Sequence, residues 1–132
     1  MTTIVRIPVH LSDEALSANG RQHWREKAAL TKALRTKSRM LHRGVRQWHD
    51  VEAAHLTVWV TWPDRRRRDV ANLAPTIKAL VDGAVDAGIL TDDSDRHLIG
   101  PDLRVTDHVT DAPGLAVLEF EWQAANEARR TE

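Results

Sequence analysis

Residues 52–88 read EAAHLTVWVTWPDRRRRDVANLAPTIKALVDGAVDAG, and they join a strand pattern to a helix pattern through four consecutive arginines. Apolar and polar side chains alternate strictly over Glu52–Trp62, which predicts a half-buried strand that Pro63 ends. Apolar residues then recur at helical spacing over Asn72–Ala87, which predicts a helix with one buried stripe. That stripe consists of Leu73, Ile77, Leu80, Val81 and Ala84.

The residue types at both ends of this second helix support its assignment. Asn72 is a favourable N-cap, and Pro75 would lie in the first turn, where its missing N–H costs nothing. Gly88 fits the position that follows a helix. Gly83 lies inside the helix, where it costs roughly 1 kcal/mol relative to Ala, so we expect a close packing contact there.

The N-terminal half predicts a strand and a long helix. Thr3–His10 is rich in β-branched residues, and its Pro8 favours either the edge of a sheet or the end of the strand. Arg21–Trp48 contains helix formers and no Pro. We expect Trp24 to pack in the core, with stacking on a nucleic-acid base as the alternative. The expected apolar stripe of this helix consists of Leu30, Leu34, Leu41, Val45 and Trp48.

The other face of the first helix is strongly basic. The span carries nine Lys/Arg against the single acid Glu26. A solvated helix face usually mixes charges, because like charges at i,i+4 oppose the helix. We therefore interpret this face as phosphate-binding rather than merely solvated. It consists of Arg21, Arg25, Lys32, Arg35, Arg39, Arg43 and Arg46, and Lys27 lies on the apolar side.

The C-terminal part predicts two more strands. Leu98–Val109 is expected to be a strand with a kink near Gly100-Pro101, and Leu115–Gln123 alternates again. Because Asp111–Gly114 is a turn sequence, we expect these two strands to form a hairpin. The predicted fold is a single α+β domain over residues 1–123, in which one mixed sheet carries two helices mostly on one face. Residues 124–132 are a polar tail.

Composition narrows the class of protein. The 132 residues include no Cys, so disulfides and thiolate metal sites are excluded. Every apolar run is too short to span a bilayer, and Met1–Arg6 lacks a signal-peptide core, so a soluble cytoplasmic protein is expected. The net charge is zero, but residues 1–68 carry 14 Lys/Arg against 6 Asp/Glu, and residues 69–132 carry 5 against 13. This asymmetry indicates a polyanionic partner, unless the two halves fold together and neutralise each other.

The arginine run and the acids near it carry the candidate chemistry. A guanidinium matches phosphate oxygens, and four like charges repel one another without a partner, so we interpret Arg65, Arg66, Arg67 and Arg68 as DNA-binding rather than as a solvated turn. Asp69, Asp92 and Asp93 could hold a hard cation that activates water for phosphodiester hydrolysis. From the residues alone, helix-terminal and turn roles for these acids come first. Lys78 could reach a phosphate or simply be solvated.

The order PDRRRRD, a capped helix, DAG and then DD resembles the RusA family of Holliday junction resolvases, small crossover-junction endodeoxyribonucleases of bacteria and phages. The resemblance is strongest over Pro63–Asp93 and extends more weakly to Leu16–Trp24 and the C-terminal strands. It implies an α/β homodimer that cleaves four-way junctions in recombination and repair, with Mg²⁺ (or Mn²⁺) at two symmetric active sites.

Carried onto this sequence, the resemblance implies metal ligands at Asp69 and Asp93, with Asp92 beside the latter and Asn72 offering an amide oxygen. It also implies a catalytic role for Lys78, if three residues are inserted before it.

One position departs from the family pattern. The usual Asp-x-Asp-Asn reads DVAN at residues 69–72, so Ala71 replaces the second acid and removes a negative charge from the metal site. Two hypotheses follow: an active Mg²⁺-dependent junction endonuclease, or a junction-binding protein that has lost catalysis. An RNA-binding protein is a third possibility.

Overall fold

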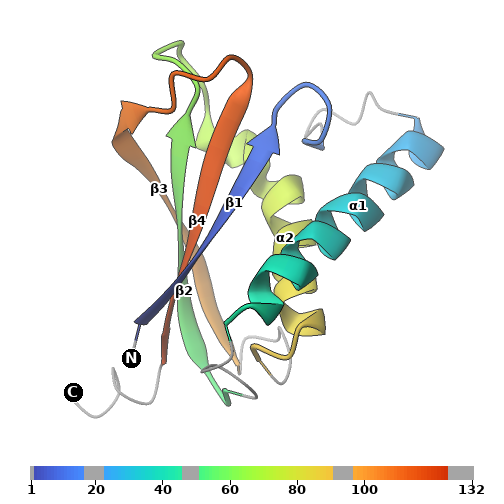
Figure 1. The fold of residues 1–132 in the computed structure, drawn as a ribbon, viewed down its shortest axis with the longest axis vertical. Coiled ribbons are helices and arrows are strands. Elements are labelled where there is room, and N and C mark those ends of the chain that lie inside the picture. Colours follow the sequence, from blue (N-terminus) through green and yellow to red (C-terminus); the bar gives the residue numbers. More distant parts are fainter. Residues whose placement is uncertain (1, 17–22, 46–50, 91–96, 125–132) are drawn as a thin grey trace.

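Four strands form one mixed sheet in the computed structural model, which describes residues 2–16, 23–45, 51–90 and 97–124 (Figure 1). The strands are β1 (Thr2–His10), β2 (Ala54–Trp62), β3 (Leu98–Val109) and β4 (Leu115–Ala124). Their order in the sheet is β1-β4-β2-β3. β4 runs antiparallel to both of its neighbours, whereas β3 runs parallel to β2. The predicted α+β fold with one mixed sheet is confirmed.

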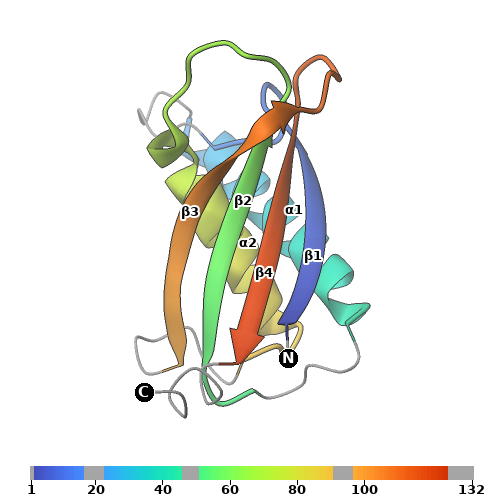
Figure 2. The same ribbon diagram turned by 90° about the vertical axis from the view of Figure 1, so that its left-hand side faces the viewer.

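The predicted hairpin between the last two strands is wrong. β3 lies at an edge beside β2, and β4 lies between β1 and β2 (Figure 2). After β3 the chain crosses the end of β2, where the N–H groups of Thr110 and Asp111 donate to the carbonyls of Trp62 and Pro63. A central position gives the apolar side chains of β4 neighbours on both sides. These fully buried side chains are Ala116, Leu118, Phe120 and Trp122.

Both edge strands contain proline, and the sequence indicated the edge position of the first strand through Pro8. Pro8 lies in β1. In β3, the register with β2 shifts opposite Gly100-Pro101, which confirms the predicted kink. Gly100 has φ +101°, and a Cβ added there would lie 2.6 Å from the Leu56 carbonyl oxygen, so this position requires glycine.

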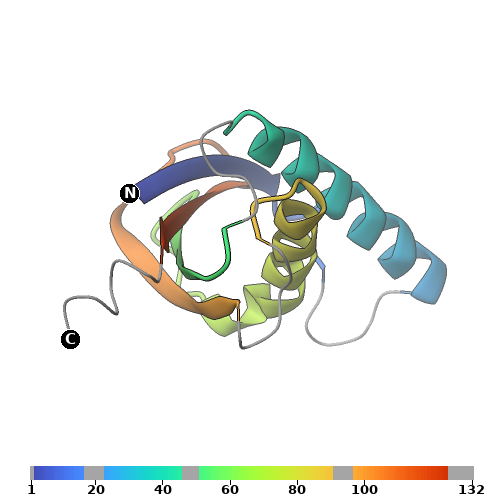
Figure 3. The same ribbon diagram turned by 90° about the horizontal axis from the view of Figure 1, so that it is seen from below.

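Two helices cover one face of the sheet, α1 (Trp24–Arg43) and α2 (Ala74–Asp86), and a short 3₁₀ turn, η1 (Val70–Leu73), leads into α2 (Figure 3). Every member of the stripe predicted for the second helix is buried. Gly88 follows α2 with φ +88°, as predicted. No helix within the described ranges is long and apolar enough to cross a membrane.

Gly83 is the point of closest approach between the two helices. A Cβ added to it would lie 2.7 Å from the Ser38 Cβ and would also meet the backbone of Arg35 and Arg39. The predicted close contact is therefore confirmed, because only a hydrogen at this position lets α1 pack directly on α2.

The buried face of α1 differs from the predicted stripe. Leu34 is buried and Leu30 half-buried, but Leu41 is 39% exposed, and Trp48 lies outside the described residues. Ser38 and His42 are buried instead, one and two turns after Leu34.

A chain of hydrogen bonds makes this polar burial possible. The Ser38 hydroxyl donates to the Leu80 carbonyl (2.5 Å), and His42 Nδ1 lies 2.9 Å from the Ser38 carbonyl oxygen. The Trp122 indole N–H donates to His42 Nε2 (3.1 Å). His42 thus joins α1 to β4, and its burial lowers its pKa to about 4.

Candidate functional site

The four arginines lie in a loop at the end of the sheet, which we call the arginine loop (Asp64–Asp69). β2 ends at Trp62, Pro63 is buried, and the loop then leads into η1 and α2 (Figure 1). The strand before it and the helix after it are both anchored in the core. The loop therefore projects from rigid elements, which is where binding residues are commonly found.

Arg68 and Asp64 close the arginine loop on itself. Arg68 Nη1 donates to Asp64 Oδ1 (2.7 Å) and Nη2 lies 3.3 Å from Oδ2, while the guanidinium carbon lies 5.3 Å from the Trp62 ring centroid. Asp64 Oδ1 also accepts the backbone N–H of Arg66 (2.9 Å). The hydrogen bond from Arg68 lowers the pKa of the Asp64 carboxyl to about 2. Arg68, whose side chain is 17% exposed, holds the shape of the loop.

The other three arginines of the loop are more exposed than Arg68. Arg65, Arg66 and Arg67 are exposed, and none of them has an ion-pair partner among the residues that the structure describes. Two hollows open between the loop and the end of β3. One, of about 200 Å³, lies beside Arg65 and Arg66, and the other, of about 530 Å³, lies beside Arg67 and Asp69. Exposed cations beside open space suit the binding of an anionic ligand.

Asp69 is the last residue of the loop, and Asn72 lies in η1, which follows it. The Asp69 carboxylate accepts the Ala71 N–H (3.0 Å) and is the N-cap of η1, so the prediction that Asn72 is the N-cap is wrong. The reason is the 3₁₀ turn that precedes α2, because it moves the start of the helical segment back to Asp69, whose backbone is extended. Asp69, Ala71 and Asn72 are all exposed, which leaves the predicted oxygen donors accessible.

The predicted partners Asp92 and Asp93 lie outside the described residues. The described residues that flank them, Leu90 and His97, follow α2, whereas Asp69 precedes it. Since α2 has 13 residues, it is roughly 20 Å long. Within the described ranges, no group of three His, Asp or Glu side chains could hold a metal ion. The structure therefore does not test the predicted four-ligand metal site.

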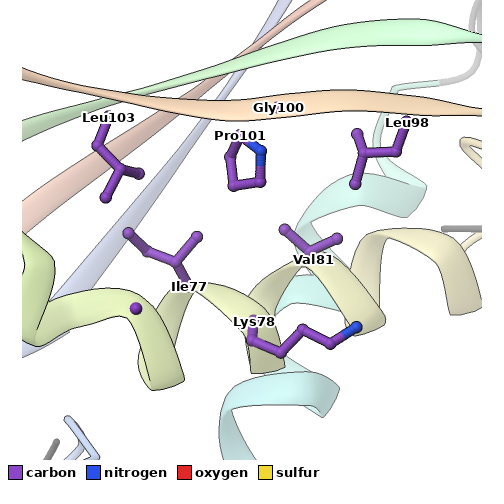
Figure 4. A pocket seen from close by; sticks show the side chains of 8 residues that line it. Ile77, Lys78, Val81, Leu98, Gly100, Pro101 and Leu103 are labelled. Atoms are coloured by element: carbon purple, nitrogen blue, oxygen red, sulfur yellow. The ribbon is translucent and has the colours of Figure 1, made fainter. Parts of the chain in front are cut away.

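Lys78 lies on the exposed side of α2. Its ammonium group donates to Asp82 Oδ1 (2.9 Å), and Figure 4 shows its side chain extending along the helix toward Val81. It borders a mainly apolar groove of about 370 Å³ between α2 and β3. The groove is lined by Ala74, Ile77, Lys78, Val81, Leu98, Gly100, Pro101 and Leu103. The phosphate-binding role that the sequence suggests for Lys78 stays a prediction.

The basic face predicted for the first helix divides into two parts. Arg35 binds Asp86 through two hydrogen bonds (2.5 and 2.8 Å), which lower the pKa of the Asp86 carboxyl. Arg39 is half-buried, and its Nε is buried without a hydrogen-bond partner among the described residues. Both therefore belong to the contact between the helices. Arg25 and Lys32 remain exposed, whereas Arg21 lies outside the described residues.

Trp24 is the clearest error among the predicted core residues, because its side chain is 67% exposed. It lies at the start of α1 beside Lys27 and Lys32 in one shallow hollow. The sequence indicated this exposure, since Trp24 stands among cations and six residues before Leu30, the first Leu of the stripe, which places it on a different face of the helix.

Compared with protein-family models, the chain matches none, and a search of the curated proteins likewise finds no match.

Proposed function

We propose that this protein is a structure-selective DNA endonuclease that cleaves four-way junctions with the help of a divalent cation. The observation that carries the proposal is the arginine loop, in which Arg65, Arg66 and Arg67 are exposed without ion-pair partners in the described part of the chain. The exposed carboxylate of Asp69 follows directly. Cations that bind phosphate and an acid that binds metal are the two elements that metal-dependent phosphodiester hydrolysis needs.

The donors on the first turn fit a hard cation. Asp69 offers a carboxylate of which one oxygen accepts the Ala71 N–H, and the exposed Asn72 offers an amide oxygen. Oxygen ligands of this kind are the ones that Mg²⁺ and Mn²⁺ prefer. In the proposal, Asp92 and Asp93 complete the set. A bound cation would supply a water of lowered pKa and neutralise charge on the phosphate.

The other residues of the proposed site bind and orient the DNA. Arg65, Arg66 and Arg67 hold the backbone phosphates, and the ion pair of Arg68 with Asp64 fixes the loop on which these three exposed side chains lie. Lys78 exchanges its hydrogen bond to Asp82 for one to a phosphate oxygen. A second copy of the chain supplies a second site for the opposed strand, because resolution of a junction needs paired nicks.

Ala71 favours a second candidate function, junction binding without cleavage. The Ala71 side chain is exposed two residues after Asp69. It offers no metal ligand at a position where the RusA family, which the sequence resembles, has an acid. Fewer negative charges weaken the binding of a divalent cation. Such a protein would bind junctions with a steep salt dependence and cut nothing in any metal.

A nicking assay on a synthetic four-way junction separates the two functions. The wild-type protein is incubated with Mg²⁺, with Mn²⁺ or with EDTA, next to Asp69→Asn and the control Asp102→Asn. Asp102 is an exposed acid of β3 that lies 2.6 Å from His55, away from the arginine loop. We expect metal-dependent nicks from the wild type and from D102N, and at least a hundredfold loss in D69N.

Undiminished cleavage by D69N would refute the ligand role of Asp69. Binding without cleavage in any metal would support the second candidate, above all if Ala71→Asp then creates cleavage. Duplex RNA is included as a competitor, and if it displaces the junction at equal concentration, the partner is RNA instead.

A further inference from the structure

Trp24 begins α1 with most of its indole in solvent. Its side chain is 67% exposed, although tryptophan is usually well buried in folded proteins. Two neighbours contact the ring: the His23 ring is stacked at a centroid distance of 5.8 Å, and the Arg25 guanidinium carbon lies 5.1 Å from the indole centroid. His23 is itself fixed as the N-cap of α1, where its side chain accepts the Arg25 N–H (3.2 Å). The indole is therefore supported and still accessible.

Cations continue from Trp24 along the same side of the helix. Lys27, Thr31 and Lys32 line one shallow hollow with Trp24, at spacings that place them on successive turns about 5.4 Å apart. Lys27 and Lys32 are exposed, and neither has an ion-pair partner among the described residues. At the far end of the hollow, Arg35 is held by Asp86. The hollow thus combines one aromatic face with a row of available positive charges.

The surroundings of Trp24 favour a nucleic acid over a protein partner. A docking site for an apolar protein surface needs a contiguous apolar patch. The other large apolar side chains of α1 that are exposed, Met40 and Leu41, lie at least 16 residues further along the helix, which is roughly 24 Å. The hollow beside the indole is lined by the cations Lys27 and Lys32 and by the small side chain of Ala28, and a polyanion with flat apolar bases matches both the charge and the aromatic face.

We propose that Trp24, Lys27 and Lys32 form a stacking platform for an unpaired DNA base, in which the base lies on the indole and the two lysines bind the flanking phosphates. The inference rests on the proposed function in one respect, because the nucleic acid is taken to be DNA. Bases in a duplex are stacked on both faces, so the platform selects unpaired bases at branch points, gaps or single strands. It lies on α1, on an element separate from the arginine loop.

Binding is measured by fluorescence anisotropy with an oligothymidylate of about 12 nucleotides and with a blunt duplex of similar length. EDTA and the D69N background exclude cleavage. The variants are Trp24→Ala and Trp24→Phe, and the matched control is Met40→Ala, which removes another exposed apolar side chain (65% exposed) from the same helix.

For W24A we expect roughly tenfold weaker binding of the oligothymidylate and less than about twofold change for the duplex, because one stacked base contributes on this scale. W24F keeps a ring and should stay within about threefold of the wild type. The slope of log K against log salt should be unchanged in W24A and reduced by about 1 in Lys32→Ala, because only the lysine releases counterions.

A second measurement locates the base directly. Ultraviolet cross-linking of an oligonucleotide that contains 5-bromouracil, followed by peptide mapping, should label the peptide of Trp24 in the wild type and not in W24A. Equal affinities of W24A and M40A for both DNAs, a cross-link elsewhere, or no binding of single strands by the wild type would overturn the platform. The nicking assay described above tests the proposed endonuclease, and its result does not affect the stacking platform, which is tested by binding alone.

Discussion

The Asp64 carboxylate and the Arg68 guanidinium form an ion pair across four residues, with Nη1 and Oδ1 2.7 Å apart, over the ring of Trp62. Two of the six charged side chains in the arginine loop thus neutralise each other and give the loop its shape. The remaining arginines are left exposed at the end of the sheet. This arrangement assigns two different roles to residues that look alike in the sequence.

We predict that Arg68 positions the loop, whereas Arg66 contacts phosphate. Arg66→Ala should weaken junction binding and reduce the slope of log K against log salt by about 1. Asp64→Asn and Arg68→Ala should weaken binding to similar extents, and the double variant should lose no more affinity than R68A, because the two changes break one interaction. Anisotropy titrations across a salt series test this. Additive losses in the double variant would show that Arg68 acts independently of Asp64.

Stability should depend on pH through His42. Its folded-state pKa of about 4 lies below the usual value of 6.5, so folding favours the neutral ring. The contribution of His42 to stability is complete above about pH 6.5 and is lost as pH falls through about 4, with a total on the order of 3 kcal/mol. A protonated ring would also place an N–H against the Trp122 indole N–H.

The measurement for this prediction is the free energy of unfolding in urea at neutral and at mildly acidic pH. His42→Gln removes the titrating group, so the difference between the two pH values should shrink. His108→Gln, at an exposed position of β3, is the control and should keep the wild-type difference. An unchanged difference in H42Q would contradict the prediction.

Gly83→Ala should destabilise the protein by about 1–3 kcal/mol, because the new methyl group would overlap Ser38 and the backbone of α1. Gly44→Ala is the matched control. Its φ of −67° suits alanine, and the added Cβ would lie 3.4 Å from the Leu41 carbonyl oxygen. We expect G44A to be neutral or stabilising by up to about 1 kcal/mol in urea denaturation followed by circular dichroism. Equal stabilities of the two variants would rule out the close helix contact.

Ala71→Asp should raise the affinity for Mn²⁺ about tenfold without a large change in stability. The position is exposed on η1, two residues from Asp69, so the new carboxylate adds a donor and meets no buried group. Isothermal titration calorimetry measures the binding. Ala74→Asp, which adds an acid at an exposed position one turn later, should produce no gain. If A74D gains as much as A71D, the effect is nonspecific charge and Asp69 is not part of a metal site.

The sequence by itself, through local patterns of residue types, determined most of the helices and strands. The alternation over β2 and the apolar stripe of α2 predicted which side chains are buried, because a strand or a helix repeats its faces at a fixed period. The sequence also predicted the helix end at Gly88 and the kink at Gly100-Pro101, because both depend on the local backbone. It predicted a close contact at Gly83, because glycine inside a helix is otherwise unfavourable. The exposed arginine loop follows from Pro63, which ends β2, and from charges that resist burial.

The tertiary structure decided the features that depend on contacts between residues far apart in the sequence. β4 lies between β1 and β2 rather than beside β3, because strand order is set by which arrangement buries the most apolar side chains, and a turn sequence cannot encode that. His42 is buried and Trp24 exposed because the direction in which α1 crosses α2 selects the face that meets the core. Arg68 differs from its three neighbours for the same reason: only the folded loop brings Asp64 and Trp62 within its reach.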